Sequence, residues 1–278
     1  MTLPGIVLAC AWVACAEAGS DRNAVDWSAR VADVPVLASA QEQMRHAAAQ
    51  SARLRRWPAA TLAAERVRVA ASWIAVRVRF PLERACVAEA SFRAAELLRW
   101  SGQIEAAVAE LELVRALGVD SSYRWRSCLE LAHIERRRRR FERALDLYLS
   151  VAGESACGSR LRDDAAIWAG KTYALLGRFD DARRWLRRVA ESAFDALDRI
   201  RAYDEWIATY VIVDDIEAAA GVLAACRGAL EAAALKPTSS GERVRIALRR
   251  MRCIALLEQA VARRRAGAVL HSRGDDDE

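Results

Sequence analysis

Three histidines and seven cysteines are the residues of this 278-residue chain whose side chains most often act as proton carriers, nucleophiles or metal ligands. The histidines His46, His133 and His271 lie far apart, and the sequence contains no His-Glu-x-x-His motif, nucleophile elbow, P-loop or Gly-x-Gly-x-x-Gly loop. Cys128 and His133 are five residues apart, so on one helix they point to different faces. The sequence therefore predicts neither a catalytic site nor a metal site, and we expect a non-enzymatic protein without a cofactor.

The cysteines do not have the spacing of a disulfide framework or a zinc site. No Cys-x-x-Cys pair occurs, and the cysteines beyond Cys10 and Cys15 are widely spaced and odd in number. We expect them to be small buried residues in the seams between helices. Cys157 lies in a stretch that is predicted to be a loop, and it is the candidate for a reactive thiol.

Positive charge exceeds negative charge, with 43 Lys and Arg against 37 Asp and Glu and a net charge of +6. Lys171 and Lys236 are the only lysines, which is typical of GC-rich codon usage and weakens an inference from basicity to nucleic acid. The densest basic run is the five arginines of residues 136–140. On a helix, five consecutive residues spread around most of the circumference and cannot all face one ligand. We favour a solvated helix face here, with an anionic partner as the alternative.

A repeat of 37 or 38 residues organises the chain. Four apolar anchors recur with spacings of 37, 38 and 37 residues, and they are Ile104, Phe141, Phe179 and Ile216. Each anchor is followed three residues later by alanine and seven residues later by a large apolar residue, which is the stripe of an amphipathic helix. A second helical pattern precedes each anchor after a tight turn, so each unit is predicted to be a helical hairpin.

These hairpins resemble the tetratricopeptide repeat (TPR) family. The resemblance is carried best by one stretch, Gly170-x-x-Tyr173-x-x-x-Gly177-Arg-Phe179-x-x-Ala182-x-x-x-Leu186. It implies an all-α fold, a right-handed α–α superhelix of four or five TPR-like hairpins. The period is longer than the usual 34 residues, which leaves related α-solenoid families open.

The remaining segments extend this repeat region. We expect residues 81–235 to be the TPR-like repeats, 36–80 a degenerate earlier repeat, 242–266 a capping helix with a polar outer face, and 267–278 a disordered acidic tail. Between Ile74 and Phe80 apolar residues alternate with arginines, which is also the period of a strand. A helix is preferred there because helical patterns flank the stretch on both sides.

The N-terminus has the pattern of an export signal. Residues 1–18 contain an uncharged apolar run of the length of a secretory h-region, followed by a small-x-small cleavage site. We expect a signal peptide or N-terminal hydrophobic segment, and hence a periplasmic or envelope-associated protein. Lipid attachment at Cys15 is a variant of this reading, and a cytoplasmic protein with a retained N-terminus is the alternative.

Resemblance to TPR proteins also implies a concave groove, lined by the first helices of successive hairpins, that binds peptides. Transferred to this sequence, it predicts a basic groove with six partner-binding residues: Arg99, Trp100, His133, Arg136, Arg137 and Lys171. Arginine-rich positions favour an acidic or carboxylate-bearing partner segment. Trp168, Trp185 and Trp206 are assigned instead to packing between hairpins.

Two functions follow from these patterns. The preferred hypothesis is a non-catalytic scaffold or adaptor of the bacterial envelope that binds a protein or peptide partner. The alternative is a cytoplasmic basic helical-repeat protein that binds nucleic acid, although Arg137 follows Trp100 by 37 residues and so breaks a regular row of stacking aromatics. A further hypothesis is that the acidic residues 275–278 fold back onto the arginines of residues 136–140.

Overall fold

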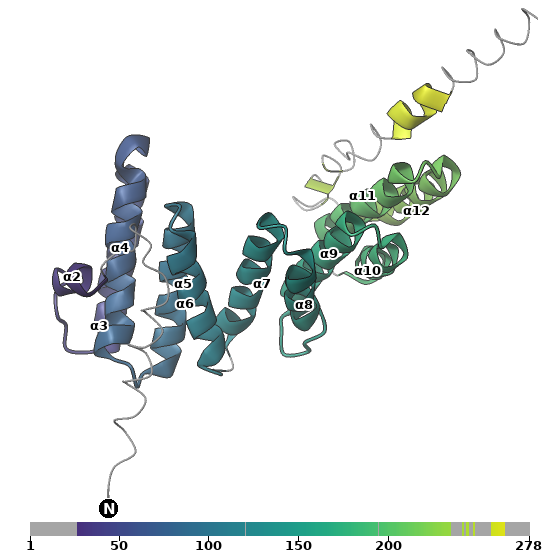
Figure 1. Cartoon of the computed structure of the whole chain (residues 1–278). Coiled ribbons are helices and arrows are strands. Elements are labelled where there is room, and N and C mark those ends of the chain that lie inside the picture. The colour runs from purple at the N-terminus through teal and green to yellow at the C-terminus, as the bar shows by residue number, and fades with distance from the viewer. Residues whose placement is uncertain are drawn as a thin grey trace, which may run out of the picture. The chain divides into compact units, whose positions relative to one another are not determined.

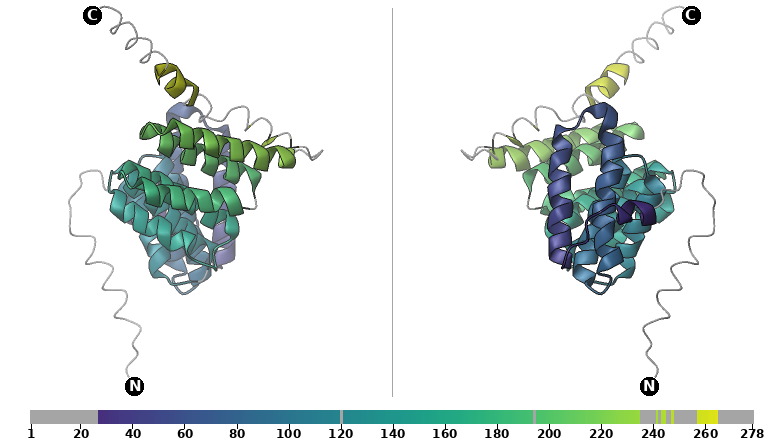
Figure 2. Two further views of the ribbon diagram at one scale, coloured as in Figure 1. Left: turned by 90° about the vertical axis from the view of Figure 1, so that its right-hand side faces the viewer. Right: turned by 90° about the vertical axis from the view of Figure 1, so that its left-hand side faces the viewer.

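The computed structural model describes residues 27–119, 121–193, 195–234, 241, 243–244, 247 and 257–264. Among these residues every regular element is a helix (Figures 1 and 2). The chain forms two compact units, Met1–Ala107 and Val108–Glu278. The predicted all-α class is therefore confirmed.

The first unit is built around helix α4 (Ala59–Arg79), which packs between α3 (Ala40–Arg53) and α5 (Arg84–Trp100). A 3-10 turn, η2 (Leu54–Arg56), precedes α4. The short helix α2 (Trp27–Ala32) packs against α4. Ile74 and Val76 are both fully buried whereas Val78 is exposed, so the alternation that also fits a strand is the end of helix α4. The preference for a helix in this stretch is confirmed.

The second unit contains most of the repeat. Helix α6 (Ile104–Ala116) begins in the first unit and ends in the second, and it is followed by α7 (Ser122–Arg137), α8 (Phe141–Ala152), α9 (Ser159–Leu175), α10 (Phe179–Ser192), α11 (Ala196–Ile212) and α12 (Ile216–Ala234). From α7 onward each helix packs against the next (Figure 1). Helix α9 also contacts both α7 and α11, which brings the first helices of three successive hairpins together.

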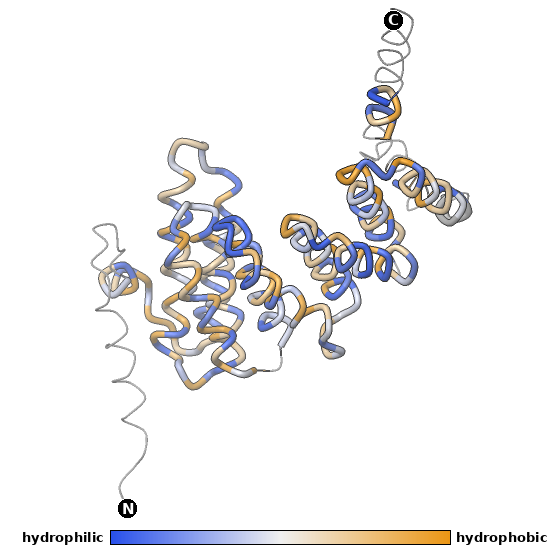
Figure 3. The backbone as a smooth tube through the Cα atoms, turned by 45° about the vertical axis from the view of Figure 1, so that its right-hand side comes forward, coloured by the Kyte–Doolittle hydropathy of each residue, from blue (hydrophilic) through white to orange (hydrophobic). Residues whose placement is uncertain are grey.

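The four anchors each begin a helix, as the spacing predicts: Ile104 begins α6, Phe141 α8, Phe179 α10 and Ile216 α12. The alanine three residues after each anchor is fully buried. The large apolar residue four positions further on is fully or almost fully buried. Hydrophobic and hydrophilic positions alternate along the helices in the way that such stripes require (Figure 3). Gly170 lies where a side chain could not, because a Cβ there would stand 2.6 Å from Leu186 Cγ.

The hairpin turns share one backbone device. The residue two positions before each anchor has a positive φ, and these residues are Gly102, Arg139, Gly177 and Asp214. The next amide then donates to the carbonyl five residues back, as from Arg140 N to Glu135 O at 3.0 Å. This is the left-handed helix end that glycine favours, yet two of the four turns use a residue with a Cβ.

Several predicted segments lie partly or wholly outside the described residues. Residues 1–18, Cys15 and 267–278 are among them, so the signal peptide, the lipid anchor and the acidic tail stay predictions. Of the predicted capping helix 242–266, residues 243–244, 247 and 257–264 are described, and they are helical. Residues 36–80 hold α3, η2 and α4, and their status as a degenerate repeat stays a prediction.

Candidate functional site

Three of the six predicted partner-binding residues meet around one tryptophan of the second unit. Trp168 lies on α9, and the Arg136 guanidinium carbon and the Lys171 ammonium nitrogen each lie 4.6 Å from the centre of its ring. The His133 ring makes an edge contact with the same indole at 4.9 Å. Because a cation over an indole face is attracted by the ring quadrupole, these contacts fix both cations in place. Glu205 joins this group through an ion pair with Lys171. We call His133, Arg136, Trp168, Lys171 and Glu205 the Trp168 cluster.

Beneath this cluster a buried phenol holds the histidine. Tyr148 of α8 is fully buried, and its hydroxyl lies 2.6 Å from His133 Nδ1. Burial raises the pKa of Tyr148 well above its ordinary value, and the Arg136 charge opposes this only in part. The phenol therefore stays protonated at neutral pH, and the hydrogen bond orients the imidazole rather than exchanging a proton.

The cluster carries negative as well as positive charge. Lys171 Nζ lies 2.6 Å from Glu205 Oε1 on α11, and one helical turn or more away Arg201 of α11 bonds Asp164 of α9 at 2.9 Å. Both ion pairs join the first helices of successive hairpins. Helices α9 and α11 thus carry carboxylates beside their cations, and the basic groove itself stays a prediction.

The other predicted residues lie elsewhere. Arg137 is exposed at the last position of α7. Arg99 and Trp100 end α5 in the first unit, where the Trp100 ring is 60% exposed and carries the Arg99 guanidinium carbon at 4.7 Å. Arg66 lies at 5.9 Å from the same ring and donates a 2.9 Å hydrogen bond to the Trp100 carbonyl. Whether all six act on one partner stays a prediction.

The assignment of Trp168 to packing alone is incomplete. Its ring is only partly buried, and the charged side chains on both sides are what it packs against. Spacing along one chain places the cations near the ring, because Lys171 follows Trp168 by three residues on the same helix. Tyr148 and Glu205 come from other helices, and no local pattern could have paired them with the cluster.

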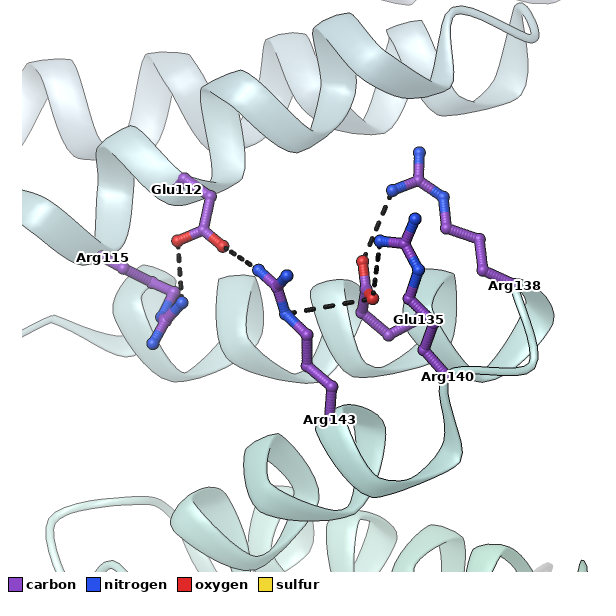
Figure 4. Close-up of polar contacts among 6 residues, drawn as sticks. All are labelled: Glu112, Arg115, Glu135, Arg138, Arg140 and Arg143. Atoms are coloured by element: carbon purple, nitrogen blue, oxygen red, sulfur yellow. Dashed lines mark hydrogen bonds and ion pairs between the residues drawn. The ribbon is translucent and has the colours of Figure 1, made fainter.

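The arginine run of residues 136–140 is only in part the solvated helix face that we expect from its sequence, because Arg137, Arg139 and Arg140 are exposed whereas Arg136 and Arg138 are half-buried. Helix α7 ends at Arg137, and the remaining residues make the turn. Glu135 is almost fully buried, and its carboxylate pairs with Arg138 at 3.4 Å and Arg140 at 3.3 Å, with Arg143 further away at 3.9 Å (Figure 4). Arg138 and Arg140 of the run therefore serve the fold, because a buried carboxylate needs compensating charge.

A second arginine-rich surface was not predicted from the sequence. Residues of helices α10 and α11 line an open groove of about 610 Å³, which we call the α10–α11 groove. Its lining includes four arginines of α10 and two aromatic residues of α11: Arg183, Arg184, Arg187, Arg188, Trp206 and Tyr210. The signal was present in the repeat alignment, because none of the other three anchor helices has a basic residue at these positions.

Other classes of site have little support among the described residues. There, no group of three or more His, Cys, Asp or Glu side chains is placed to hold a metal ion, and no helix has the length and apolarity to cross a membrane. Cys157 does lie between helices, but it is buried, and burial raises the pKa of its thiol to about 11. A thiol of that pKa has little thiolate at neutral pH, which argues against a reactive cysteine.

Comparison with known proteins gives the fold. No family model and no curated protein matches the chain. Two crystal structures of nearly identical TPR-like repeats of a kinesin light chain from Podosopora anserina match with TM-scores of 0.55 and 0.54, at 15% identity, over 69% of this chain and 96% of theirs. BtubC from P. vanneervenii matches at 17% identity with a TM-score of 0.49, over 82% of this chain and 94% of its own. The two kinesin light chain matches and the four aligned hairpins show a TPR-like helical-repeat fold.

Proposed function

We propose that this chain is a non-catalytic protein-interaction scaffold and that the Trp168 cluster binds an acidic segment of a partner protein. One observation carries the proposal: two cations from neighbouring hairpins are held on a single, partly exposed indole. An indole offers apolar contact area at low entropic cost, and a guanidinium offers a fork that matches a carboxylate. The TPR-like fold supports the same proposal, since repeat folds present extended binding surfaces.

Glu205 indicates how a partner carboxylate would be received. Its oxygen lies 2.6 Å from Lys171 Nζ, so the ammonium group beside Trp168 already holds one carboxylate in good geometry. A partner Asp or Glu would share Lys171 with Glu205 and meet the Arg136 guanidinium over the same indole. His133, held by Tyr148, closes the third side of the indole.

We also propose that the protein acts in the bacterial envelope, on the apolar pattern of residues 1–18. The N-terminal mass of the chain recovered from its host tests this part separately. A chain that begins near Gly19, or a lipid-modified Cys15, would support export. Recovery of unprocessed Met1 from the cytoplasm would contradict it.

The binding proposal is tested with an array of short synthetic peptides that differ in their number of Asp and Glu residues, together with a labelled single-stranded oligonucleotide. We expect retention of peptides to rise with their acidic content, and Arg136→Gln plus Lys171→Gln to weaken it about tenfold, which corresponds to about 1.4 kcal/mol. The matched control, Arg160→Gln plus Arg227→Gln, removes the same charge from exposed positions of α9 and α12 and should retain binding within about twofold.

Two results would overturn the proposal. Equal loss with both pairs of substitutions would mean that net charge, not the cluster, holds the peptides. Tighter binding of the oligonucleotide than of every peptide would favour the nucleic-acid alternative.

A further inference from the structure

The α10–α11 groove is set apart from the rest of the repeat by the residues that line it. Its four arginines stand four, five, eight and nine residues after the anchor Phe179. The same positions in α6, α8 and α12 hold only apolar, small or acidic residues: Val108, Ala109, Glu112 and Leu113; Leu145, Asp146, Leu149 and Ser150; Ala220, Gly221, Ala224 and Ala225. Since three anchor helices fold without a basic residue there, the hairpin does not require these arginines.

One arginine of the groove is fixed, and it gives the groove a rigid end. Arg183 Nε donates to Thr209 Oγ1 at 3.2 Å and Arg183 Nη2 to the Thr209 carbonyl at 3.3 Å. Its guanidinium carbon also lies 4.0 Å from the centre of the Tyr210 ring. The nearby Trp206 Nε1 is buried and has no hydrogen-bond partner. This end of the groove therefore combines a held cation, two aromatic rings and an unused donor.

The other arginines remain open to an anion. The side chains of Arg184 and Arg187 are 74% and 63% exposed, and among the described residues each forms an ion pair with a carboxylate of its own helix, Asp181 and Glu191. Exposed pairs of this kind contribute little to stability, so a second carboxylate can replace or share them at small cost. Arg188 is exposed as well and lies over the Trp185 ring at 5.3 Å.

The C-terminal part of this chain is anchored beside the same end of the groove. Ala260, Arg263 and Arg264 face Val211, Ile212 and Asp214 across a hollow of about 440 Å³. Arg264 donates to the Asp214 carbonyl and lies 3.3 Å from its carboxylate. Asp214 lies in the turn directly after α11, where Asp215 N donates to the Tyr210 carbonyl at 3.0 Å. Arg264 is thus held at the end of α11 that carries Tyr210.

The segment that follows has the length and charge to occupy the groove. Asp275 follows Arg264 by eleven positions, and an extended chain of that length spans up to about 36 Å. Helix α10 has 14 residues and is about 21 Å long, so every arginine of the groove lies within reach. Residues 275–278 are Asp-Asp-Asp-Glu, four consecutive negative charges, and the groove that they would enter is lined by four arginines and two carboxylates, Asp180 and Glu191.

We propose that residues 275–278 of this chain bind in the α10–α11 groove, with their carboxylates on Arg184, Arg187 and Arg188 and the chain entering at Arg183 and Tyr210. A tethered segment competes at an effective concentration in the millimolar range, so the tail shields the groove from other acidic peptides. The proposal replaces the arginines of residues 136–140 as the tail's target, since Arg138 and Arg140 already bind Glu135. It does not depend on the function proposed for the Trp168 cluster.

The test uses a fluorescein-labelled peptide of residues 270–278 and two forms of the protein, the full chain and the chain that ends at Gly274. Fluorescence anisotropy should show binding to the shortened chain and at least tenfold weaker binding to the full chain, whose own tail competes. In the shortened chain, Arg184→Glu plus Arg187→Glu should weaken binding at least tenfold. A milder pair, Arg184→Gln plus Arg187→Gln, should weaken it less, and raised salt should weaken the unsubstituted complex.

Two controls separate this surface from general charge and from the Trp168 cluster. Arg160→Glu plus Arg227→Glu changes the net charge equally at exposed positions outside the groove and should leave binding within about twofold. Arg136→Gln plus Lys171→Gln should also leave it unchanged, even though this pair tests the proposed function. Equal binding to the full and shortened chains, no binding to either, or equal loss with the control pair would each overturn the proposal.

Discussion

Two arginine-rich regions of the second unit use the same side chain in opposite ways. In the turn after α7, Arg138 and Arg140 pair with the buried carboxylate of Glu135 (Figure 4). On α10, Arg184 and Arg187 stand out into a groove with only local carboxylates beside them. A run of arginines is therefore not by itself evidence of a binding surface, because a single buried carboxylate can pair with it inside the protein.

The largest effect is expected where the turn loses that carboxylate. Glu135→Gln keeps the shape of the side chain but leaves Arg138, Arg140 and Arg143 without their shared negative charge. We expect the free energy of unfolding to fall by about 2 kcal/mol, measured by urea denaturation. Asp146→Asn, an exposed carboxylate on α8, is the matched control and should change it by less than about 0.5 kcal/mol. Equal effects would mean that Glu135 does not organise the turn.

The turn at Gly177, before α10, tests whether backbone conformation contributes to stability in the same way as at Arg139. Gly177 has φ +73 at the position that Arg139 occupies in the other region, with φ +62. Gly177→Ala adds a Cβ to a left-handed residue and should cost about 1 kcal/mol in the same denaturation experiment. Gly221→Ala, at a helical glycine of α12 with open space around it, should be neutral or stabilising. A loss at Gly221 as large as that at Gly177 would show that backbone handedness is not the cause.

The substitution Arg139→Gly tests whether Arg139, unlike Arg138 and Arg140, is dispensable for the stability of the turn. Arg139 is exposed, and its positive φ is the conformation that glycine adopts without strain. Arg139→Gly should therefore raise the free energy of unfolding by about 0.5–1 kcal/mol, although it removes a charge from the run. Thermal unfolding by circular dichroism measures the change. A loss of stability would instead place Arg139 with Arg138 and Arg140 among the residues that hold the turn.

The smallest effect on stability is expected in the groove. Arg184→Gln plus Arg187→Gln removes two exposed ion pairs within one helix, and the free energy of unfolding should change by less than about 0.5 kcal/mol. Urea denaturation of the chain that ends at Gly274 gives this value without any contribution from the tail. A loss comparable with that of Glu135→Gln would mean that both arginine-rich regions serve the fold.

The repeat was predictable from sequence because its determinants are local. The buried alanine after each anchor and the apolar stripe recur at fixed spacing, so the starts of α6, α8, α10 and α12 follow from the chain alone. The turn at Arg139 lacks the glycine that marks the turns at Gly102 and Gly177, and the run of arginines was consequently taken for a helix face. Because Arg139 is not a glycine, the sequence does not mark the end of α7.

The candidate site was only partly predictable for a related reason. His133, Arg136 and Lys171 were found by aligning the first helices, and they do meet at Trp168. Glu205 and Tyr148 reach the cluster from α11 and α8, and Trp206 and Tyr210 reach the groove from the helix after the arginines. Such contacts join side chains across the packing of helices, which spacing along the sequence does not encode.

The most direct test of the contrast between the two arginine-rich regions is the rate at which phenylglyoxal modifies each arginine, followed by mass spectrometry in the full chain and in the chain that ends at Gly274. The account predicts that Arg184 and Arg187 react faster once residues 275–278 are removed, whereas Arg138 and Arg140, already bound to Glu135, react at the same rate in both forms. Faster modification of Arg138 and Arg140 in the shortened chain, with Arg184 and Arg187 unchanged, would contradict it.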